Sequence, residues 1–279
     1  MSRSRPTTDN IRATYDGFTD TYARVWGENL HVGYWDEPGA DSPVAAATDR
    51  LNSELIARLR TQPGDAVLDV GCGIGRPALR LARELDVSVV GVTISVYQVE
   101  RATDNARAEG LGDRVSFSEA DVCSLPFDDR SFDAVWAMES LHHVADRAGA
   151  LSEIYRVLRP GGCLAMADFS LRRPASGAEL DVITGFREAG GVATLTLIED
   201  VLGDLRAAGL ELESLTDVGD YVRPTMARHA DLFRQARPML EPRMGVVALD
   251  EMIIRNEQLA TCRPFGYILL SACRPVVSP

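Results

Sequence analysis

Two adjacent histidines and a distant aspartate are the residues of this sequence best suited to acid–base chemistry. His142 and His143 follow an apolar run at 132–138, and Asp168 directly ends a second apolar run at 163–167. Each run predicts a buried strand, and in an open α/β sheet ligands lie beyond the carboxyl ends of the strands. A neutral histidine whose other ring nitrogen is held by a carboxylate is an effective general base. The sequence therefore predicts proton abstraction at this edge, with these three side chains as the candidate catalytic residues.

A strand, a glycine-rich turn and a helix form the segment that must position a ligand beside these candidates. Residues 66–70 predict a short buried strand, and residues 76–85 have helical spacing with a proline near the first turn. Between them, Gly71, Gly73 and Gly75 permit a sharp turn and the close approach of a ligand to the backbone. This order is typical of the nucleotide-binding corner of a doubly wound α/β fold. A structural turn without a ligand is the alternative.

The glycine spacing and the residue before it indicate which ligand this corner holds. The pattern G-x-G-x-G differs from the dinucleotide G-x-G-x-x-G, and Asp69 precedes it at the end of the strand. A carboxylate there would repel a pyrophosphate but attract the ammonium and sulfonium groups of S-adenosylmethionine. The segment resembles the first motif of the class I S-adenosylmethionine-dependent methyltransferases, an acidic residue followed by x-G-x-G-x-G. The resemblance implies a doubly wound, mostly parallel seven-stranded sheet of Rossmann-like α/β class, in which the strands before His142 and Asp168 are neighbours.

The segment after the second predicted strand, at 87–92, supplies further candidates for cofactor binding. An acidic residue about 20 positions after the glycines usually binds ribose hydroxyls in this architecture, but Thr93 stands there. Thr93, Ser95 and Gln98 match the G-V-T-x-S-x-x-Q pattern of a methyltransferase subgroup, and this resemblance implies that their side chains surround the cofactor. Ser95 is also the expected N-cap of a helix over 96–109, and both roles can hold together.

The third predicted strand, at 115–120, leads to the last pair of cofactor candidates. In the enzymes that this segment resembles, an acidic residue directly after the strand binds the adenine amino group, and the next residue makes a backbone contact. Asp121 and Val122 occupy these two positions. The resemblance therefore implies that they hold the adenine end of the cofactor.

Two segments narrow the resemblance to a reaction. Residues 30–35, Leu-His-Val-Gly-Tyr-Trp, resemble a segment of sugar O-methyltransferases and cyclopropane fatty acid synthases that lies near the methionine end of the cofactor. His31 is accordingly either a residue of the site or a structural one. His142 with Asp168 resembles the bacterial natural-product sugar O-methyltransferases of the rebeccamycin type, whereas a histidine at the position of His143 is common to methyltransferases with varied acceptors. The resemblance implies methyl transfer to a hydroxyl, expected on a sugar, of a small secondary metabolite, with S-adenosylhomocysteine as product.

Three alternatives remain beside this interpretation. A carbon methyltransferase acting on a terpenoid or aromatic acceptor would have an apolar pocket without carboxylates. A cyclase that keeps the methyltransferase fold but transfers no methyl group would retain the same cofactor motifs. A nicotinamide-dependent oxidoreductase is disfavoured by Asp69, by Thr93 and by the glycine spacing.

Composition limits the partners and the location. The chain of 279 residues has a net charge of −12, which disfavours nucleic acid and anionic membrane surfaces as partners. It contains no lysine, so P-loop and Schiff-base lysines are excluded.

The five cysteines form no C-x-x-C pair, and residues 1–10 are polar, so we expect a cytoplasmic protein without disulfides or a signal peptide. No ligand cluster has a familiar metal-binding spacing, so no metal is expected. The chain is expected to be a monomer or a homodimer.

The chain divides into a core and parts that cover it. Residues 1–60 predict an N-terminal helical cap segment, including a helix over 42–60 with a Ser42 cap. Its aromatic stripe of Tyr15, Phe18, Tyr22 and Trp26 is either a packing surface or the face of a helix that closes over the cofactor. Residues 61–279 predict the cofactor-binding core, with insertions at 171–194 and 221–260 that should determine the acceptor.

Overall fold

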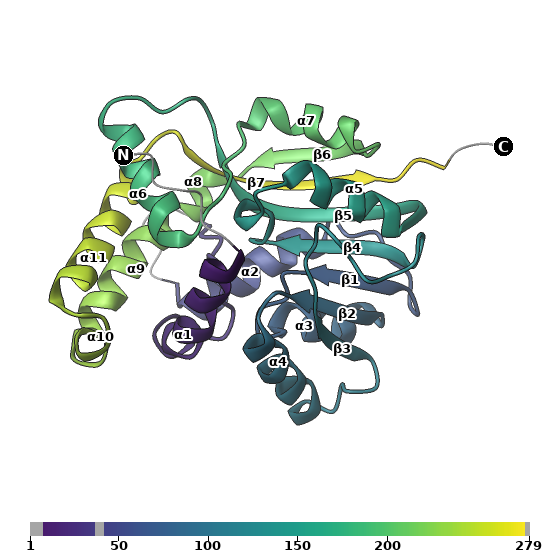
Figure 1. The fold of residues 1–279 in the computed structure, drawn as a ribbon, viewed down its shortest axis with the longest axis horizontal. Coiled ribbons are helices and arrows are strands. Elements are labelled where there is room, and N and C mark those ends of the chain that lie inside the picture. Colours follow the sequence, from purple (N-terminus) through teal and green to yellow (C-terminus); the bar gives the residue numbers. More distant parts are fainter. Residues whose placement is uncertain (1–7, 37–41, 277–279) are drawn as a thin grey trace.

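A seven-stranded sheet with helices on both faces organises the chain (Figure 1). The structure is a computed structural model, and it describes residues 8–36 and 42–276. The strand order is β3-β2-β1-β4-β5-β7-β6, and every neighbouring pair is parallel except those that β7 makes with β5 and β6. The doubly wound, mostly parallel sheet expected from the sequence is thereby confirmed.

The strands lie close to the apolar runs of the sequence, and one of them is longer than its run. They are β1 Ala66–Val70, β2 Ser88–Thr93, β3 Val115–Glu119, β4 Phe132–Met138, β5 Leu158–Leu171, β6 Glu211–Asp217 and β7 Phe265–Cys273. Residues 159–162, which precede the apolar run, already belong to β5, because the Gly161 N–H and the Gly162 carbonyl bond to the backbone of Arg274. Pairing with β7 continues to Leu171, so β5 extends beyond the expected end at 167.

Helices cover both faces of the sheet because its strands alternate their buried side chains between the two. The helices are α1 Thr8–Trp26, α2 Val44–Ile56, α3 Arg76–Leu85, α4 Val96–Ala108, the 3-10 turn η1 Leu141–His143, α5 Arg147–Val157, α6 Ala178–Gly190, α7 Ile198–Ala207, α8 Gly219–Val222, α9 Pro224–Gln235, α10 Arg237–Met244 and α11 Val246–Thr261. Trp136 of β4 packs with α2 and α3, and the adjacent Val135 packs with α5 and α7 on the opposite face.

Helix α2 differs from the sequence expectation in its start and in its place. It begins at Val44, because Pro43 is the N-cap with an extended ψ of 145°, and no side chain caps it. The Ser42 cap was therefore a wrong prediction. Leu51 and Leu55 of α2 are fully buried in the core cluster against the sheet. Of the predicted N-terminal segment, α2 thus packs as part of the core.

The aromatic stripe of α1 meets the helices at the opposite end of the chain. The side chains of Tyr15 and Phe18 lie outside the described part of the structure. Tyr22 donates or accepts a hydrogen bond of 2.8 Å between its hydroxyl and Nε2 of His229, and the Trp26 ring lies 4.0 Å from the His229 ring. These two aromatic residues pack α1 against α9.

The helices of the predicted insertions gather at one end of the sheet. Figure 1 shows α6, α9, α10 and α11 together at the left, with α1 beside them. Helices α9, α10 and α11 share a small apolar core of Ala230, Phe233, Leu240, Leu249 and Ile253. Whether these helices determine the acceptor stays a prediction.

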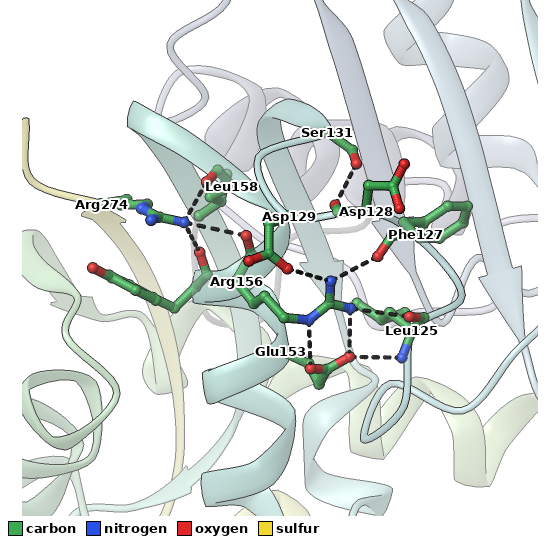
Figure 2. Close-up of polar contacts among 10 residues, drawn as sticks. Leu125, Phe127, Asp128, Asp129, Ser131, Glu153, Arg156, Leu158 and Arg274 are labelled. Carbon is green, nitrogen blue, oxygen red and sulfur yellow. Dashed lines mark hydrogen bonds and ion pairs between the residues drawn. The ribbon is translucent and has the colours of Figure 1, made fainter.

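Hydrogen bonds from two arginines fix the connection between β3 and β4 and the end of α5 (Figure 2). The guanidinium of Arg156 donates hydrogen bonds to the carbonyls of Phe127 and Leu125 at 2.7 and 3.0 Å, and also bonds to Glu153. Arg274 donates to the carbonyls of Tyr155, Arg156 and Leu158, at the carboxyl end of α5, where helix carbonyls have no intrahelical partner. The loop that leads from Asp121 to β4 is therefore fixed to α5.

Candidate active site

A cavity of about 460 Å³ lies at the carboxyl ends of β1, β2, β3 and β4. The predicted residues that line it are Asp69, Gly71, Gly73, Thr93, Gln98, Asp121, Val122, His142 and His143. Three predicted residues do not line it: Gly75, Ser95 and Asp168. The cavity thus combines the glycine corner with the two histidines, as expected from the carboxyl-edge rule for parallel sheets.

His142 and Asp168 are joined across the ends of two neighbouring strands. Nδ1 of His142 donates a hydrogen bond to Oδ1 of Asp168, and the carboxylate partner assigns the proton to Nδ1. The opposite nitrogen, Nε2, makes no hydrogen bond among the described residues and belongs to a side chain of the cavity wall. The His142 carbonyl accepts bonds from Ala193 and Thr194, which fix the turn η1. The lone pair of Nε2 is therefore held ready to accept a proton.

Asp168 is buried but remains a carboxylate. Burial alone would raise its pKa, but the His142 ring, the hydrogen bond from it and the Arg147 guanidinium lower the pKa below the usual value. Arg147 Nη1 lies 3.9 Å from Oδ2 of Asp168, and Phe169 N–H donates to Oδ1 at 2.9 Å. A buried carboxylate beside an imidazole stabilises the positive charge that proton uptake creates. Arg147 had no signal in the sequence analysis.

The ring proton of His143 is used in a hydrogen bond to the backbone. Its Nδ1 donates to the carbonyl of Gly191 at 3.0 Å. Burial and the neighbouring His142 lower the pKa of His143 to about 3, so the ring is neutral at physiological pH. The two rings lie 4.0 Å apart, and His143 forms part of the cavity wall.

Asp69 presents a carboxyl group that the protein itself leaves unsatisfied. It is buried at the end of β1, and its Oδ2 has no hydrogen-bond partner among the described residues. Burial raises the pKa of Asp69 to about 7. An unpaired buried carboxylate is costly, so a cation in the cavity would relieve it.

Glycine is needed at the three positions of the turn for different structural reasons. A Cβ on Gly71 would lie 2.4 Å from the Cβ of Ser140, and one on Gly75 would lie 2.6 Å from the ring of Phe117. A Cβ on Gly73 would meet only Leu30, at 3.7 Å, on the cavity side of the turn. Gly71 and Gly75 therefore permit close packing, and Gly73 keeps space open in the cavity.

The segment after β2 divides between the cavity and the helix start. Thr93 Oγ1 donates to Gln98 Oε1 at 2.7 Å, and both side chains line the cavity. Ser95 accepts a bond from the Gln98 N–H at 3.0 Å as the N-cap of α4, and its hydroxyl donates to Asp16 of α1 at 2.5 Å. Of the two roles considered for Ser95, the structure places it in the cap.

Two further cavity residues, Glu139 and His31, were not among the residues predicted to act in catalysis or cofactor binding. Glu139 follows β4 directly, lines the cavity and has a positive φ of 49°. Its position satisfies the same carboxyl-edge rule that selected His142, so a signal was present. His31 also lines the cavity; its Nδ1 donates to the Val32 carbonyl at 2.8 Å, and burial lowers its pKa to about 4.

Residues 8–36 and 42–276 contain neither a cluster of metal ligands nor a membrane-spanning helix. In that part of the chain, no group of three or more His, Cys, Asp or Glu side chains is arranged to hold a metal ion. No described helix has both the length and the apolar character needed to cross a bilayer.

Comparison with known proteins identifies the family. Residues 68–166 match the model of a methyltransferase domain. The chain is 42% identical over 273 residues to 27-O-demethylrifamycin SV methyltransferase of Amycolatopsis mediterranei, covering 98% of this chain and 99% of that protein. The chain belongs to the class I S-adenosylmethionine-dependent methyltransferases.

Two further proteins similar to this methyltransferase have different named activities. O-methyltransferase resE of Aspergillus sclerotiorum is 34% identical, covering 97% of this chain and 98% of that protein. The crystal structure of the [4+2]-cyclase SpnF is 35% identical, with a TM-score of 0.84 and 98% of both chains covered. The relatives of this methyltransferase therefore include proteins named for O-methylation and one named for cyclisation.

The cavity of this methyltransferase fits S-adenosylmethionine, the cofactor of its family. The unsatisfied carboxyl oxygen of Asp69 suits a cationic ligand, and the space at Gly73 admits one close to the backbone. A pyrophosphate would instead add negative charge beside this carboxylate.

Proposed function

We propose that this protein is an O-methyltransferase that transfers the methyl group of S-adenosylmethionine to a hydroxyl of a small natural product. The observation that carries the proposal is the His142–Asp168 pair, whose free Nε2 belongs to the same cavity as the glycine corner. When bound, S-adenosylmethionine supplies an electrophilic methyl group. What the protein must add is alignment of the acceptor oxygen and removal of its proton.

The cofactor would be held by residues on three strand ends. We assign the ammonium and sulfonium region to Asp69, the backbone approach to Gly71 and Gly73, and the ribose side to Thr93 and Gln98. Asp121 and Val122 then take the adenine, with Asp121 Oδ1 already accepting a bond from the Cys123 N–H at 2.9 Å. Gly75 and Ser95 act indirectly, by packing and capping the two helices that follow.

The His142–Asp168 pair accounts for the proton that the reaction releases. Transfer of the methyl group to the acceptor oxygen would leave the cofactor as a neutral thioether, and the hydroxyl proton of the acceptor would have to be taken up by the protein. Nε2 of His142 takes the hydroxyl proton, and the carboxylate of Asp168 stabilises the imidazolium. His143 contributes shape to the cavity wall rather than a proton acceptor.

The acceptor we propose is a hydroxyl-bearing secondary metabolite, with a sugar hydroxyl as the first choice. The likeness of the His142–Asp168 pair to rebeccamycin-type sugar O-methyltransferases supports a sugar. The name of the relative from Amycolatopsis mediterranei supports 27-O-demethylrifamycin SV as a second probe. A carbon methyltransferase is less well supported, because the cavity carries the carboxyl groups of Asp69 and Glu139 beside His142.

Cyclisation without methyl transfer is the second candidate, favoured by the likeness to SpnF. A cyclase would need no proton acceptor for a hydroxyl and would not consume the cofactor. A methyltransferase instead releases one molecule of S-adenosylhomocysteine in each turnover.

The proposed partners follow from the charge and the site. A small-molecule acceptor is the substrate, and the net charge of −12 supports the absence of nucleic acid and anionic membrane among the partners. A cytoplasmic location, and a state of monomer or homodimer, stay predictions, and gel filtration with light scattering measures the latter.

The experiment is an acceptor panel with S-adenosylhomocysteine release as the readout. The panel contains 27-O-demethylrifamycin SV, glycosides with free sugar hydroxyls and terpenoid alcohols. Acceptor-dependent release together with a mass gain of one methyl group supports the proposal. Conversion of a polyene substrate without release of S-adenosylhomocysteine would support the cyclase instead.

A further inference from the structure

Glu139 is a half-buried carboxylic acid that the proposed methyl transfer does not yet use. It follows β4 directly, three positions before His142, and its N–H donates to the carbonyl of Ala167 on β5 at 2.8 Å. Its φ of 49° is one that residues other than glycine rarely adopt. The surrounding structure thus maintains an unfavourable backbone conformation at the point where this side chain enters the cavity.

Its two carboxyl oxygens have unequal surroundings. Oε1 accepts hydrogen bonds from the Val32 N–H and from the Tyr267 hydroxyl, both at 2.9 Å. Oε2 has no hydrogen-bond partner among the described residues, yet it is not among their fully buried unsatisfied atoms. Because the side chain lines the cavity, Oε2 is the oxygen that a ligand there can reach.

The two bonds at Oε1 fix the direction of the carboxyl group. Val32 lies in the segment at 30–35, whose next residue, Gly33, donates its N–H to the Thr225 hydroxyl of α9 at 3.0 Å. Tyr267 comes from β7 and is fully buried. A carboxyl group held from two sides presents its free oxygen to the ligand with little freedom to lose on binding.

We propose that Glu139 is an acceptor-binding residue. Its Oε2 accepts a hydrogen bond from a second hydroxyl of the acceptor, near the hydroxyl that His142 deprotonates. This inference rests on the proposed O-methyltransferase function and adds the class of acceptor: a polyol, with a hydroxyl near the one that is methylated. A carbonyl or ether at the same place would leave this oxygen without a donor.

Two other roles of Glu139 make different demands on it. A purely structural anchor needs only an acceptor at Oε1 for Val32 and Tyr267. A partner for the cofactor ammonium needs negative charge, and Asp69 on β1 already has an unsatisfied carboxyl oxygen for this purpose. Because Glu139 and His142 line the same cavity and both follow β4, we assign Glu139 to the acceptor side of the reacting groups.

The test is the Glu139→Gln variant, because its amide oxygen can still accept both bonds now made at Oε1. Steady-state kinetics are measured with an acceptor that the wild-type protein methylates, beginning with 27-O-demethylrifamycin SV, and S-adenosylhomocysteine affinity is measured by calorimetry. We expect the acceptor KM to rise roughly tenfold, the usual consequence of losing one hydrogen bond to a charged group. The affinity for S-adenosylhomocysteine should change by less than about twofold.

A deoxy analogue of the same acceptor, lacking the neighbouring hydroxyl, identifies the bond. The wild-type KM should rise for this analogue, whereas Glu139→Gln should treat the two acceptors alike, since one interaction is removed in both cases. Glu84→Gln, at an exposed ion pair with Arg80 on α3, is the matched control and should equal the wild type.

The outcomes that overturn the inference are distinct. An unchanged acceptor KM in Glu139→Gln, with the wild type active, assigns Glu139 a structural role and leaves the proposed function intact. A weaker affinity for S-adenosylhomocysteine with an unchanged acceptor KM assigns it to the cofactor. A wild-type protein that releases no S-adenosylhomocysteine with any acceptor refutes the proposed function and this inference together.

Discussion

Nδ1 of His142 and Oδ1 of Asp168 meet because β4 ends at Met138, beside Ala167 of its parallel neighbour β5, and Asp168 is the next residue of β5. The register pairs Met138 with Ala167, and each acid–base residue follows within a few positions of that pair. The chain thereby builds a buried carboxylate–imidazole pair from residues 26 positions apart. Asp168 thereby keeps the proton of the neutral His142 ring on Nδ1 and supplies the negative charge that stabilises the imidazolium.

Removing the imidazole of His142 tests its role as the general base. His142→Ala should lower kcat by roughly 10²–10⁴, the usual contribution of one general base. Affinity for S-adenosylhomocysteine should remain nearly unchanged, because Asp69, Thr93 and Gln98 form a separate wall of the cavity. Single-turnover kinetics and calorimetry measure the two quantities. His143→Asn is the control, and we expect it to alter KM more than the proton step.

Asp168→Asn should also slow turnover, because an amide does not stabilise the imidazolium that forms. The double variant with His142→Ala should lose much less than the product of the two single losses, since the residues act as one unit. Independent, multiplicative losses would contradict the pairing. Full kcat in His142→Ala would remove the base assignment altogether.

The raised pKa of Asp69 predicts how cofactor binding depends on pH. Burial raises this pKa to about 7, and only the ionised carboxylate attracts a cation. Affinity for S-adenosylhomocysteine should therefore approach its maximum above about pH 8 and fall as the pH decreases, by about 25-fold between pH 7.5 and 5.5. Isothermal titration calorimetry across this range measures the change.

Asp69→Asn is the comparison that isolates the group. Glu139 has a pKa of about 7 in the same cavity, so the variant is needed to show which of the two carboxyl groups causes the pH dependence. Asp69→Asn should bind more weakly at pH 7.5 and lose most of the slope. An equal slope in the variant and the wild type would show that Asp69 does not bind the cation.

Gly73 and Gly75 should fail in different ways when a side chain is added. Gly73→Val projects into open space at the cavity, so we expect at least a tenfold loss of S-adenosylhomocysteine affinity. Gly75→Ala places a Cβ against Phe117 and Ala102 at a φ of 82°, which costs about 2 kcal/mol of stability. At roughly 2–4 °C per kcal/mol, its Tm should fall by about 4–8 °C.

Calorimetry and thermal melts distinguish the two glycine variants. Both substitutions introduce strain, since Gly73 has a φ of 52°, so a small loss of Tm in Gly73→Val is expected as well. The account would be contradicted by a Gly73→Val protein that binds S-adenosylhomocysteine normally while it melts at a lower temperature.

Metal removal should not affect turnover. The proton acceptor is a histidine, and methyl transfer from a sulfonium needs no Lewis acid. Dialysis against a chelator should leave kcat within about twofold of its starting value. Loss of activity that magnesium restores would overturn this prediction.

The sequence predicts best those elements whose signal is local. The strands at 66–70 and 132–138 and the helix at 76–85 have the expected bounds, because apolar runs, glycines and a helix-starting proline mark them. Ser95 as the cap of α4 is local too, since its partner is the N–H three residues on.

Contacts between distant segments leave no such signal. Glu139 bonds to Val32, 107 positions away, and to Tyr267, 128 positions away, so its immobilised carboxyl group is visible only in the fold. The packing of α2 on the sheet likewise depends on partners in β5 and β7 rather than on its own apolar pattern. Arg147 reaches Asp168 from the first turn of α5, where a surface arginine is the ordinary expectation.

The most direct test of O-methylation follows the methyl group itself. The wild type and His142→Ala are each incubated with S-adenosylmethionine carrying a carbon-13 methyl group and the accepted substrate, and the product is analysed by NMR. The account predicts a single labelled methoxy carbon on the acceptor with the wild type, and at most a trace of the same product with His142→Ala. A label attached to carbon, or a product without label, would contradict it.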